Sequence, residues 1–122
     1  MNTNLNLAEL FHHATDLTKL SAGETLFREG DQGQFMYILM TGSVEISVHG
    51  RVVEIAEAGA TLGEMAKISD EPRSATVMAQ SDCTLLPLER ERFNFLIQQT
   101  PNFALKVMRI IATRLRRTDA IL

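Results

Sequence analysis

The alternation of apolar and polar residues divides the chain into a helical N-terminal segment, a strand-rich middle and a helical end. Six stretches of the middle are short, rich in β-branched or aromatic residues and bounded by turn-forming residues, as strands are. They are 24–30, 35–42, 43–50, 51–59, 74–80 and 83–88. In the third of them, Val44, Ile46 and Val48 alternate with polar residues, which is typical of a strand with one solvated face. The turn at His49-Gly50 then predicts a hairpin with the fourth.

Strands so closely spaced leave no room for crossover helices, so the middle predicts a barrel or sandwich rather than a parallel sheet. Ahead of it, the apolar residues from Leu7 to Phe11 have helical spacing, and Leu17 and Leu20 extend the same face. The pattern therefore predicts a helical segment over 1–22.

The last third of the chain predicts two helices within residues 90–122, the second of them opened by Thr100 as N-cap and Pro101. That second helix carries two apolar stripes. A coiled-coil seam consists of Ala104, Met108, Ile111, Leu115, Thr118 and Leu122, and the other stripe of Phe103, Val107 and Ile110. Two stripes need two partners, so we expect one on the chain's own strands and one in a homodimer through 101–122. The alternative is that a single chain buries both.

Composition fits one globular domain, because the chain has 122 residues, 45% of them hydrophobic and 22% charged. The net charge of -3 divides unevenly: residues 1–89 hold 13 acidic and 5 basic side chains, and 90–122 hold 2 and 7. An acidic body does not attract phosphate backbones through its overall field, so an anionic ligand needs a local site. No second helical pair follows to enter a groove, which argues against direct DNA binding. The single cysteine, Cys83, forms no disulfide within the chain, and no signal peptide or membrane span is apparent, so we expect a cytoplasmic protein.

The candidate chemistry lies in 59–77, which is too long for a simple hairpin loop. Gly63 permits close approach of a ligand, and a short helix starting at Glu64 would direct free amides at an anion. Arg73 offers a planar fork to the same phosphate. The Glu64 carboxylate would repel a phosphate, so it suits a neutral hydroxyl. Together these groups suit a sugar phosphate.

The stretch GEMAKISDEPRSATV resembles the phosphate-binding cassette of the cyclic nucleotide-binding domain family. The upstream GETLFREGDQGQFMYILMTGSVEI and the C-terminal helix are similar to the family too, so the resemblance covers about residues 11 to 122. It implies a mainly β fold: an eight-stranded antiparallel, jelly-roll-like β-roll with a short N-terminal helix, a cassette helix and two C-terminal helices. The single domain would span 1–122, with the roll over 23–89 and the cassette over 59–77.

The resemblance also implies roles for individual residues. Arg73 would bind the cyclic phosphate and Glu64 the ribose 2′-hydroxyl, while backbone amides near Gly63, Ala66 and Ser74 complete the phosphate site. Thr118 matches the position where the family's long helix contacts the adenine amino group. The full expected ligand set is Leu62, Gly63, Glu64, Met65, Ala66, Arg73, Ser74, Ala75 and Thr118.

The function implied is a regulatory module that senses cAMP, or else cGMP, and signals to a protein partner through its C-terminal helix. We expect no catalysis, because Glu64 and Arg73 supply neither a nucleophile nor an acid–base pair. We expect no metal or catalytic cofactor either, since the adjacent His12 and His13 face different sides of a helix. Lys67 departs from the family, which usually has a large apolar hinge residue there. That departure gives weight to an alternative, a ligand-independent dimeric docking domain with a degenerate site.

Overall fold

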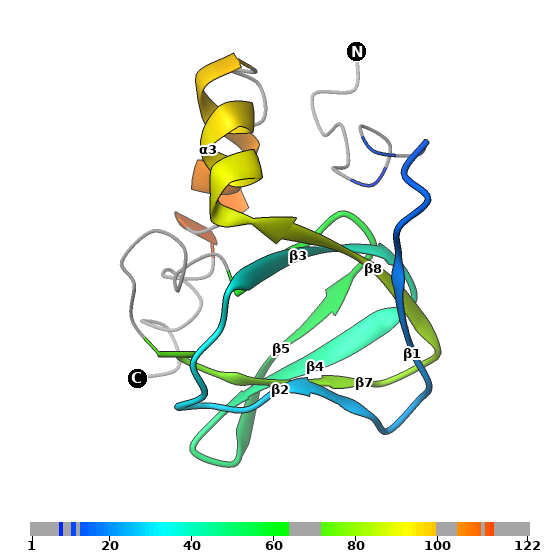
Figure 1. The fold of residues 1–122 in the computed structure, drawn as a ribbon. Coiled ribbons are helices and arrows are strands. Elements are labelled where there is room, and N and C mark those ends of the chain that lie inside the picture. The colour runs from blue at the N-terminus through cyan, green and yellow to red at the C-terminus, as the bar shows by residue number, and fades with distance from the viewer. Residues whose placement is uncertain are drawn as a thin grey trace.

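The computed structural model describes residues 8, 11, 13–63, 72–99, 105–110, 112 and 113. Eight strands form two four-stranded antiparallel sheets (Figure 1). The first has the order β1 (Thr18–Leu20), β8 (Cys83–Glu89), β3 (Phe35–Thr41) and β6 (Thr61–Leu62). The second has the order β2 (Thr25–Phe27), β7 (Thr76–Ala79), β4 (Ser43–Val48) and β5 (Arg51–Glu57). The predicted eight-stranded β-roll is confirmed.

The hairpin of β4 and β5 forms as its alternation predicts. Val44 and Ile46 are buried, and the strands pair with Ser43 opposite Glu57. The connecting His49 and Gly50 have φ of 51° and 79°. A two-residue turn with positive φ at both positions has the twist that antiparallel strands require, which explains the glycine in this turn.

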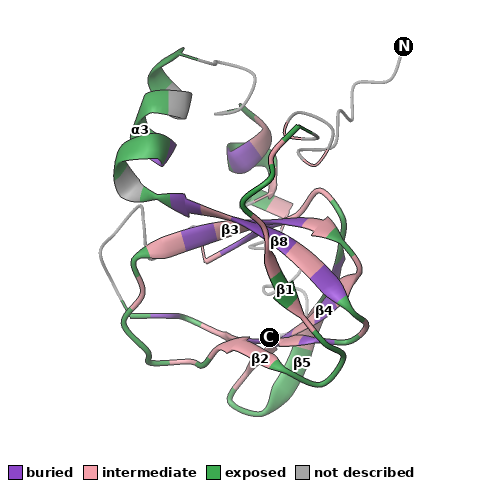
Figure 2. Cartoon of the chain, turned by 45° about the vertical axis from the view of Figure 1, so that its right-hand side comes forward, coloured by how far each residue is buried: buried purple, intermediate pink, exposed green. Residues whose placement is uncertain are grey.

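Two apolar clusters stabilise the roll, one on each face of the first sheet. The cluster between the sheets contains Leu39, Val44, Ile46, Ala56, Leu62, Val77, Ala79, Cys83 and Leu85. The cluster on the outer face contains Met36, Ile38, Leu86, Leu88, Phe93 and Val107. Successive residues of a strand face opposite ways, so both β3 and β8 contribute to both clusters. Figure 2 shows this as buried segments along these two strands.

The helical end packs on the outer face of the first sheet. Helix α3 (Arg90–Gln99) follows β8 directly and contributes Phe93 to the outer cluster (Figure 1). Residues 105–110 are helical as well, and Val107 is 2% exposed whereas Met108 is 63% exposed. Val107 and Ile110, the described members of their stripe, therefore pack on the roll. The expected start at Thr100-Pro101 lies outside the described residues. In the part of the chain that the structure describes, no helix is long and apolar enough to cross a bilayer.

The N-terminal segment differs from the expectation. Residues 18–20 form β1, which pairs with β8 through Thr18 opposite Leu85 and Leu20 opposite Cys83. The prediction that the helical face continues to Leu20 is therefore wrong. Leu20 packs against the cluster between the sheets, and β1 covers a β8 edge that would otherwise leave backbone groups unpaired.

Candidate functional site

The loop between β2 and β3 holds the main chain of Arg73. The Arg73 N–H donates to the Asp31 carbonyl at 2.8 Å, and the Arg73 carbonyl accepts from the Gly30 N–H at 2.8 Å. The loop is itself tied, because the Asp31 carboxylate accepts the Arg28 N–H at 3.0 Å. A residue clamped on both sides in this way has few backbone conformations open to it. The side chain of Arg73 therefore starts from a fixed point.

The guanidinium of Arg73 is buried, and only 5% of the residue is exposed. Its Nη2 donates to the Phe35 carbonyl at 2.6 Å, and its Nη1 donates to the Gly63 carbonyl at 3.3 Å. Within the described residues, Nε has no hydrogen-bond partner and no carboxylate lies within ion-pair distance of the group. Arg73 is thus a buried cation with unused donors.

Two other residues pack directly on the guanidinium. Its Cζ atom lies 4.2 Å from the ring centroid of Phe27, a cation–π contact. A Cβ atom on Gly33 would overlap with Nη2, Cζ and Nε together, and one on Gly63 would overlap with Nη1. Only glycine fits at these two positions while Arg73 keeps this conformation.

Burial sets the electrostatics of the site. Desolvation lowers the pKa of Arg73, while the nearby Tyr37 and Asp31 act in the opposite direction. An arginine stays protonated in proteins, so the group is a cation despite this shift. A planar cation with unsatisfied N–H groups matches a phosphate or carboxylate, which accepts two parallel hydrogen bonds.

The structure places two of the predicted site residues, Gly63 and Arg73, in contact through the bond from Nη1 to the Gly63 carbonyl. Leu62 lies in β6 and is 1% exposed, with its side chain in the cluster between the sheets. Ser74 is exposed, and Ala75 is half-buried against that cluster. The other predicted site residues, Glu64, Met65, Ala66 and Thr118, lie outside the described residues, as does Lys67.

Sequence reasoning missed the residues that surround the guanidinium. Phe27, Gly33 and Phe35 come from β2, the following loop and the start of β3, far along the chain from Arg73. Their only signal was the Gly-Asp-Gln-Gly stretch at 30–33, which marks a tight loop without naming its neighbour.

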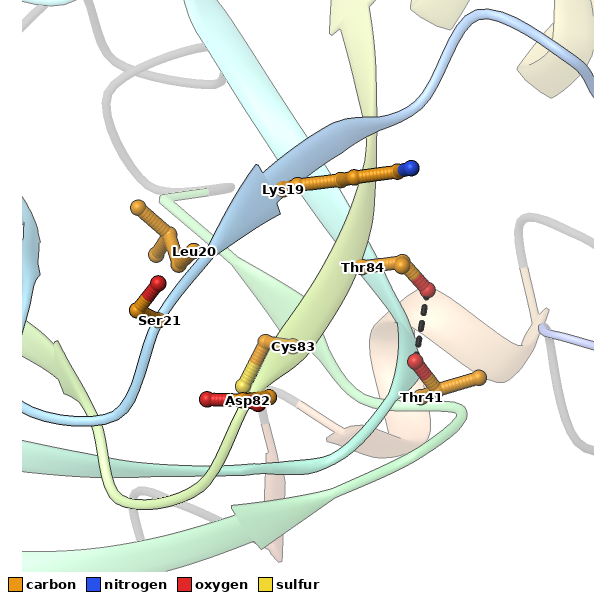
Figure 3. Close-up of a pocket in the computed structure, with 7 residues that line it drawn as sticks. All are labelled: Lys19, Leu20, Ser21, Thr41, Asp82, Cys83 and Thr84. Carbon is orange, nitrogen blue, oxygen red and sulfur yellow. Dashed lines mark hydrogen bonds between the residues drawn. The ribbon is translucent and has the colours of Figure 1, made fainter.

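Arg73 lies at the Phe35 end of β3. A separate cavity of about 270 Å³ lies at the opposite end of this strand, beside Thr41. It is lined by Lys19, Leu20, Ser21, Thr41, Asp82, Cys83 and Thr84 (Figure 3). The hydroxyls of Thr41 and Thr84 are hydrogen-bonded at 2.7 Å. None of the predicted ligand-binding residues lines this cavity. Among the described residues, no three His, Cys, Asp or Glu side chains gather as metal ligands.

Comparison with known proteins gives a family match and several structural matches. A family model described as "Cyclic nucleotide-binding domain" matches residues 17–100. The catabolite activator protein of Thermus thermophilus is 28% identical with a TM-score of 0.78, over 98% of this chain and 58% of that one. The EAL enzyme Bd1971 is 28% identical in its cGMP-bound form (TM-score 0.67) and 27% in its cAMP-bound form (TM-score 0.66), over 86% of this chain and 29% of that one.

Among curated sequences, lysophospholipase NTE1 of Chaetomium globosum is 35% identical over 122 aligned residues, which is 93% of this chain and 8% of that protein. The first relatives by similarity are all much longer, and the chain spans from 7% to 36% of their length. The match therefore concerns one domain of each relative.

Proposed function

The chain belongs to the family of cyclic nucleotide-binding domains, and from this premise we propose that it is a regulatory module that binds cAMP, with cGMP as the alternative ligand. The guanidinium of Arg73 binds the cyclic phosphate. The observation that carries this proposal is a buried cation with an unpartnered Nε and no carboxylate partner among the described residues. A phosphate supplies both the charge and the acceptors that this group lacks.

The rest of the proposed site follows the cassette motif. Backbone amides of Gly63, Ala66 and Ser74 complete the phosphate site, and the carboxylate of Glu64 accepts the ribose 2′-hydroxyl. Thr118 contacts the base from the last helix. Support for either purine comes from the Bd1971 enzyme, whose solved forms include one with cAMP and one with cGMP.

The proposed output is a change in how the C-terminal helix packs. Nucleotide would favour one arrangement of the cassette against that helix, by no more than the difference in affinity between the two arrangements. The helix also forms the proposed homodimer through 101–122. In support, the seam residue Met108 is 63% exposed while its neighbour Val107 is buried in the chain's own core. A protein partner then reads the change, and the module itself catalyses nothing.

The binding test is isothermal titration of the purified chain with cAMP and then cGMP at fixed salt. We expect saturable binding by the parent and none detectable by Arg73→Glu. The matched control is Arg51→Glu, which makes the same charge change at an exposed position of β5 and should bind as the parent does. Full affinity in a folded Arg73→Glu variant would refute the phosphate assignment. A folded parent that binds neither nucleotide, by titration and by a direct binding assay, would favour the ligand-independent docking domain.

The dimer is tested separately by sedimentation equilibrium of the parent and of Met108→Glu. We expect a concentration-dependent dimer in the parent and a monomer in the variant, because the new carboxylate would be buried in the seam without a partner. The exposed Phe95 of α3 lies outside the seam, so Phe95→Glu is the control and should stay dimeric. A monomeric parent at high concentration would overturn the dimer proposal.

A further inference from the structure

The guanidinium of Arg73 contacts two residues that nothing in the cassette motif names. The ring centroid of Phe27 lies 4.2 Å from Cζ. The main chain of Gly33 packs on the group as well, since a Cβ there would overlap with Cζ, Nε and Nη2 at once. The three atoms that a Cβ on Gly33 would approach most closely all belong to the side of the guanidinium that carries Nε and Nη2, so the Gly33 main chain packs tightly on that side.

We propose that Phe27 and Gly33 are positioning residues for the phosphate-binding cation, which they fix through an aromatic ring and a closely packed glycine backbone. This inference rests on the proposed function, because it assigns the task of presenting Arg73 to a cyclic phosphate. The guanidinium meets a phosphate through its edges, where its N–H groups lie.

The hydrogen bonds on those edges support the proposal. Nη2 is held by the Phe35 carbonyl at 2.6 Å, whereas the bond from Nη1 to the Gly63 carbonyl is 3.3 Å long, and Nε has no partner among the described residues. One donor thus anchors the group and the others remain for an acceptor. A phosphate that accepts from Nε would remove the cost of a buried, unpaired N–H.

Gly33 is suited to this task by the absence of a side chain rather than by an unusual backbone. Two glycines contact Arg73. Gly63 has a φ of 76°, so its backbone conformation alone favours glycine, whereas the φ of Gly33 lies outside the left-handed region. Alanine at Gly33 therefore carries no left-handed strain, and the three heavy atoms nearest to its methyl group all belong to Arg73.

The experiment compares Gly33→Ala and Phe27→Leu with the parent in titrations with cAMP. We expect affinity to fall at least tenfold in Gly33→Ala, because the displaced guanidinium no longer aligns with the phosphate. In Phe27→Leu we expect a loss of about threefold to thirtyfold, which is the worth of a cation–π contact expressed as affinity. The control Gln32→Ala changes an exposed residue of the same loop, and Phe95→Leu changes an exposed aromatic ring on α3; both should bind as the parent does.

A spectroscopic readout separates positioning from general destabilisation. In ¹H–¹⁵N spectra of the nucleotide-free chain, the Nε–H signal of Arg73, assigned by its loss in Arg73→Lys, should be shifted by the ring current of Phe27. That shift should disappear in Phe27→Leu and change in Gly33→Ala, with no change in the two controls. If Gly33→Ala does not fold, Phe27→Leu alone decides the question.

The outcomes distinguish this inference from the proposed function. Parent-like affinity and an unmoved Nε–H signal in both variants would overturn the inference while leaving nucleotide binding intact. A parent that binds no nucleotide would refute the proposed function, and the Nε–H signal would still support or overturn the placement of Arg73 by Phe27 and Gly33.

Discussion

Both carboxylate oxygens of Glu29 contact His49 at the tip of the β4–β5 hairpin. Oε1 accepts the His49 N–H at 2.9 Å, and Oε2 lies 3.3 Å from His49 Nδ1. The Glu29 N–H in turn donates to the hydroxyl of Thr76, at the start of β7, at 3.0 Å. The next residue, Gly30, donates to the carbonyl of Arg73. Glu29 therefore links the hairpin tip to the loop that holds Arg73, the proposed phosphate-binding residue.

Replacement of Glu29 by alanine should loosen this link. In the variant, the N–H of His49, a residue with φ of 51°, no longer has the Glu29 carboxylate as its hydrogen-bond acceptor. We expect this loss to lower the free energy of unfolding by about 1 kcal/mol. Urea denaturation followed by circular dichroism measures the change. Glu57→Ala removes an exposed carboxylate from the far end of β5 and serves as the control. Equal stability of the two variants would mean that the contact between Glu29 and His49 contributes nothing measurable.

Thr61 carries a second unpaired polar group. Its side chain is fully buried, and its Oγ1 has no hydrogen-bond partner within the described residues. Valine has the same shape without the hydroxyl, so Thr61→Val should raise the free energy of unfolding by about 1 kcal/mol. The control is Thr41→Val, which breaks the 2.7 Å bond to the Thr84 hydroxyl and should be neutral or slightly destabilising. If Thr61→Val instead destabilises the chain, the hydroxyl is bonded in the folded protein.

Cys83 should be protected from thiol reagents in the native state. The residue is 3% exposed, and its Sγ donates to the carbonyls of Ser43 at 3.2 Å and Ser81 at 3.1 Å. We expect iodoacetamide to label it only at the rate of unfolding, because the thiolate is the reactive form and burial disfavours it. Labelling measured across a urea gradient checks this. A rate in native buffer close to that of a free cysteine peptide would contradict it.

The same burial predicts a pH dependence of stability. Desolvation raises the pKa of Cys83 in the folded state, against weaker opposing effects of its hydrogen bonds. The stabilising contribution of the neutral thiol is therefore complete below the ordinary thiol pKa of about 8.5 and is lost as pH rises through the higher folded value. The parent should lose stability relative to Cys83→Ala as pH rises above that ordinary value. A difference that stays constant with pH would show that the thiol does not titrate in the unfolding reaction.

The strands that could be predicted are those long enough to show alternation. Val44, Ile46 and Val48 repeat every second residue across β4, and this period distinguishes a strand from a helix. β1 and β6 have three and two residues, so they show no period, and their pairing is decided by neighbours elsewhere in the chain. The three-residue spacing of Leu17 and Leu20 is compatible with a helix as well as with a strand. The sequence therefore predicted that the helical face continues to Leu20, where the structure has β1.

The site divides in a similar way. The sequence points to Arg73 and Gly63 as candidates because they belong to one continuous motif, and the structure joins them by a hydrogen bond. The contacts of Phe27 and Gly33 with Arg73 could not be predicted, since they depend on how β2 and the loop after it pack beside Arg73. Gly33 contributes by having no side chain, and such a role has no sequence pattern of its own. It becomes visible only when the structure places the Arg73 guanidinium against this glycine.

Val107 and Met108 are adjacent in the chain yet should respond differently to truncation. Val107 is 2% exposed and packs with Phe93 and Leu88, so Val107→Ala should lower the free energy of unfolding by about 1 to 3 kcal/mol. Met108 is 63% exposed in the single chain, so Met108→Ala should change the stability of the monomer by no more than about 0.5 kcal/mol. Thermal unfolding at low protein concentration, where a dimer dissociates, measures both. If Met108→Ala matters only at high concentration, the residue is buried between subunits, whereas equal losses from the two variants at every concentration would mean that one chain covers both stripes of the helix.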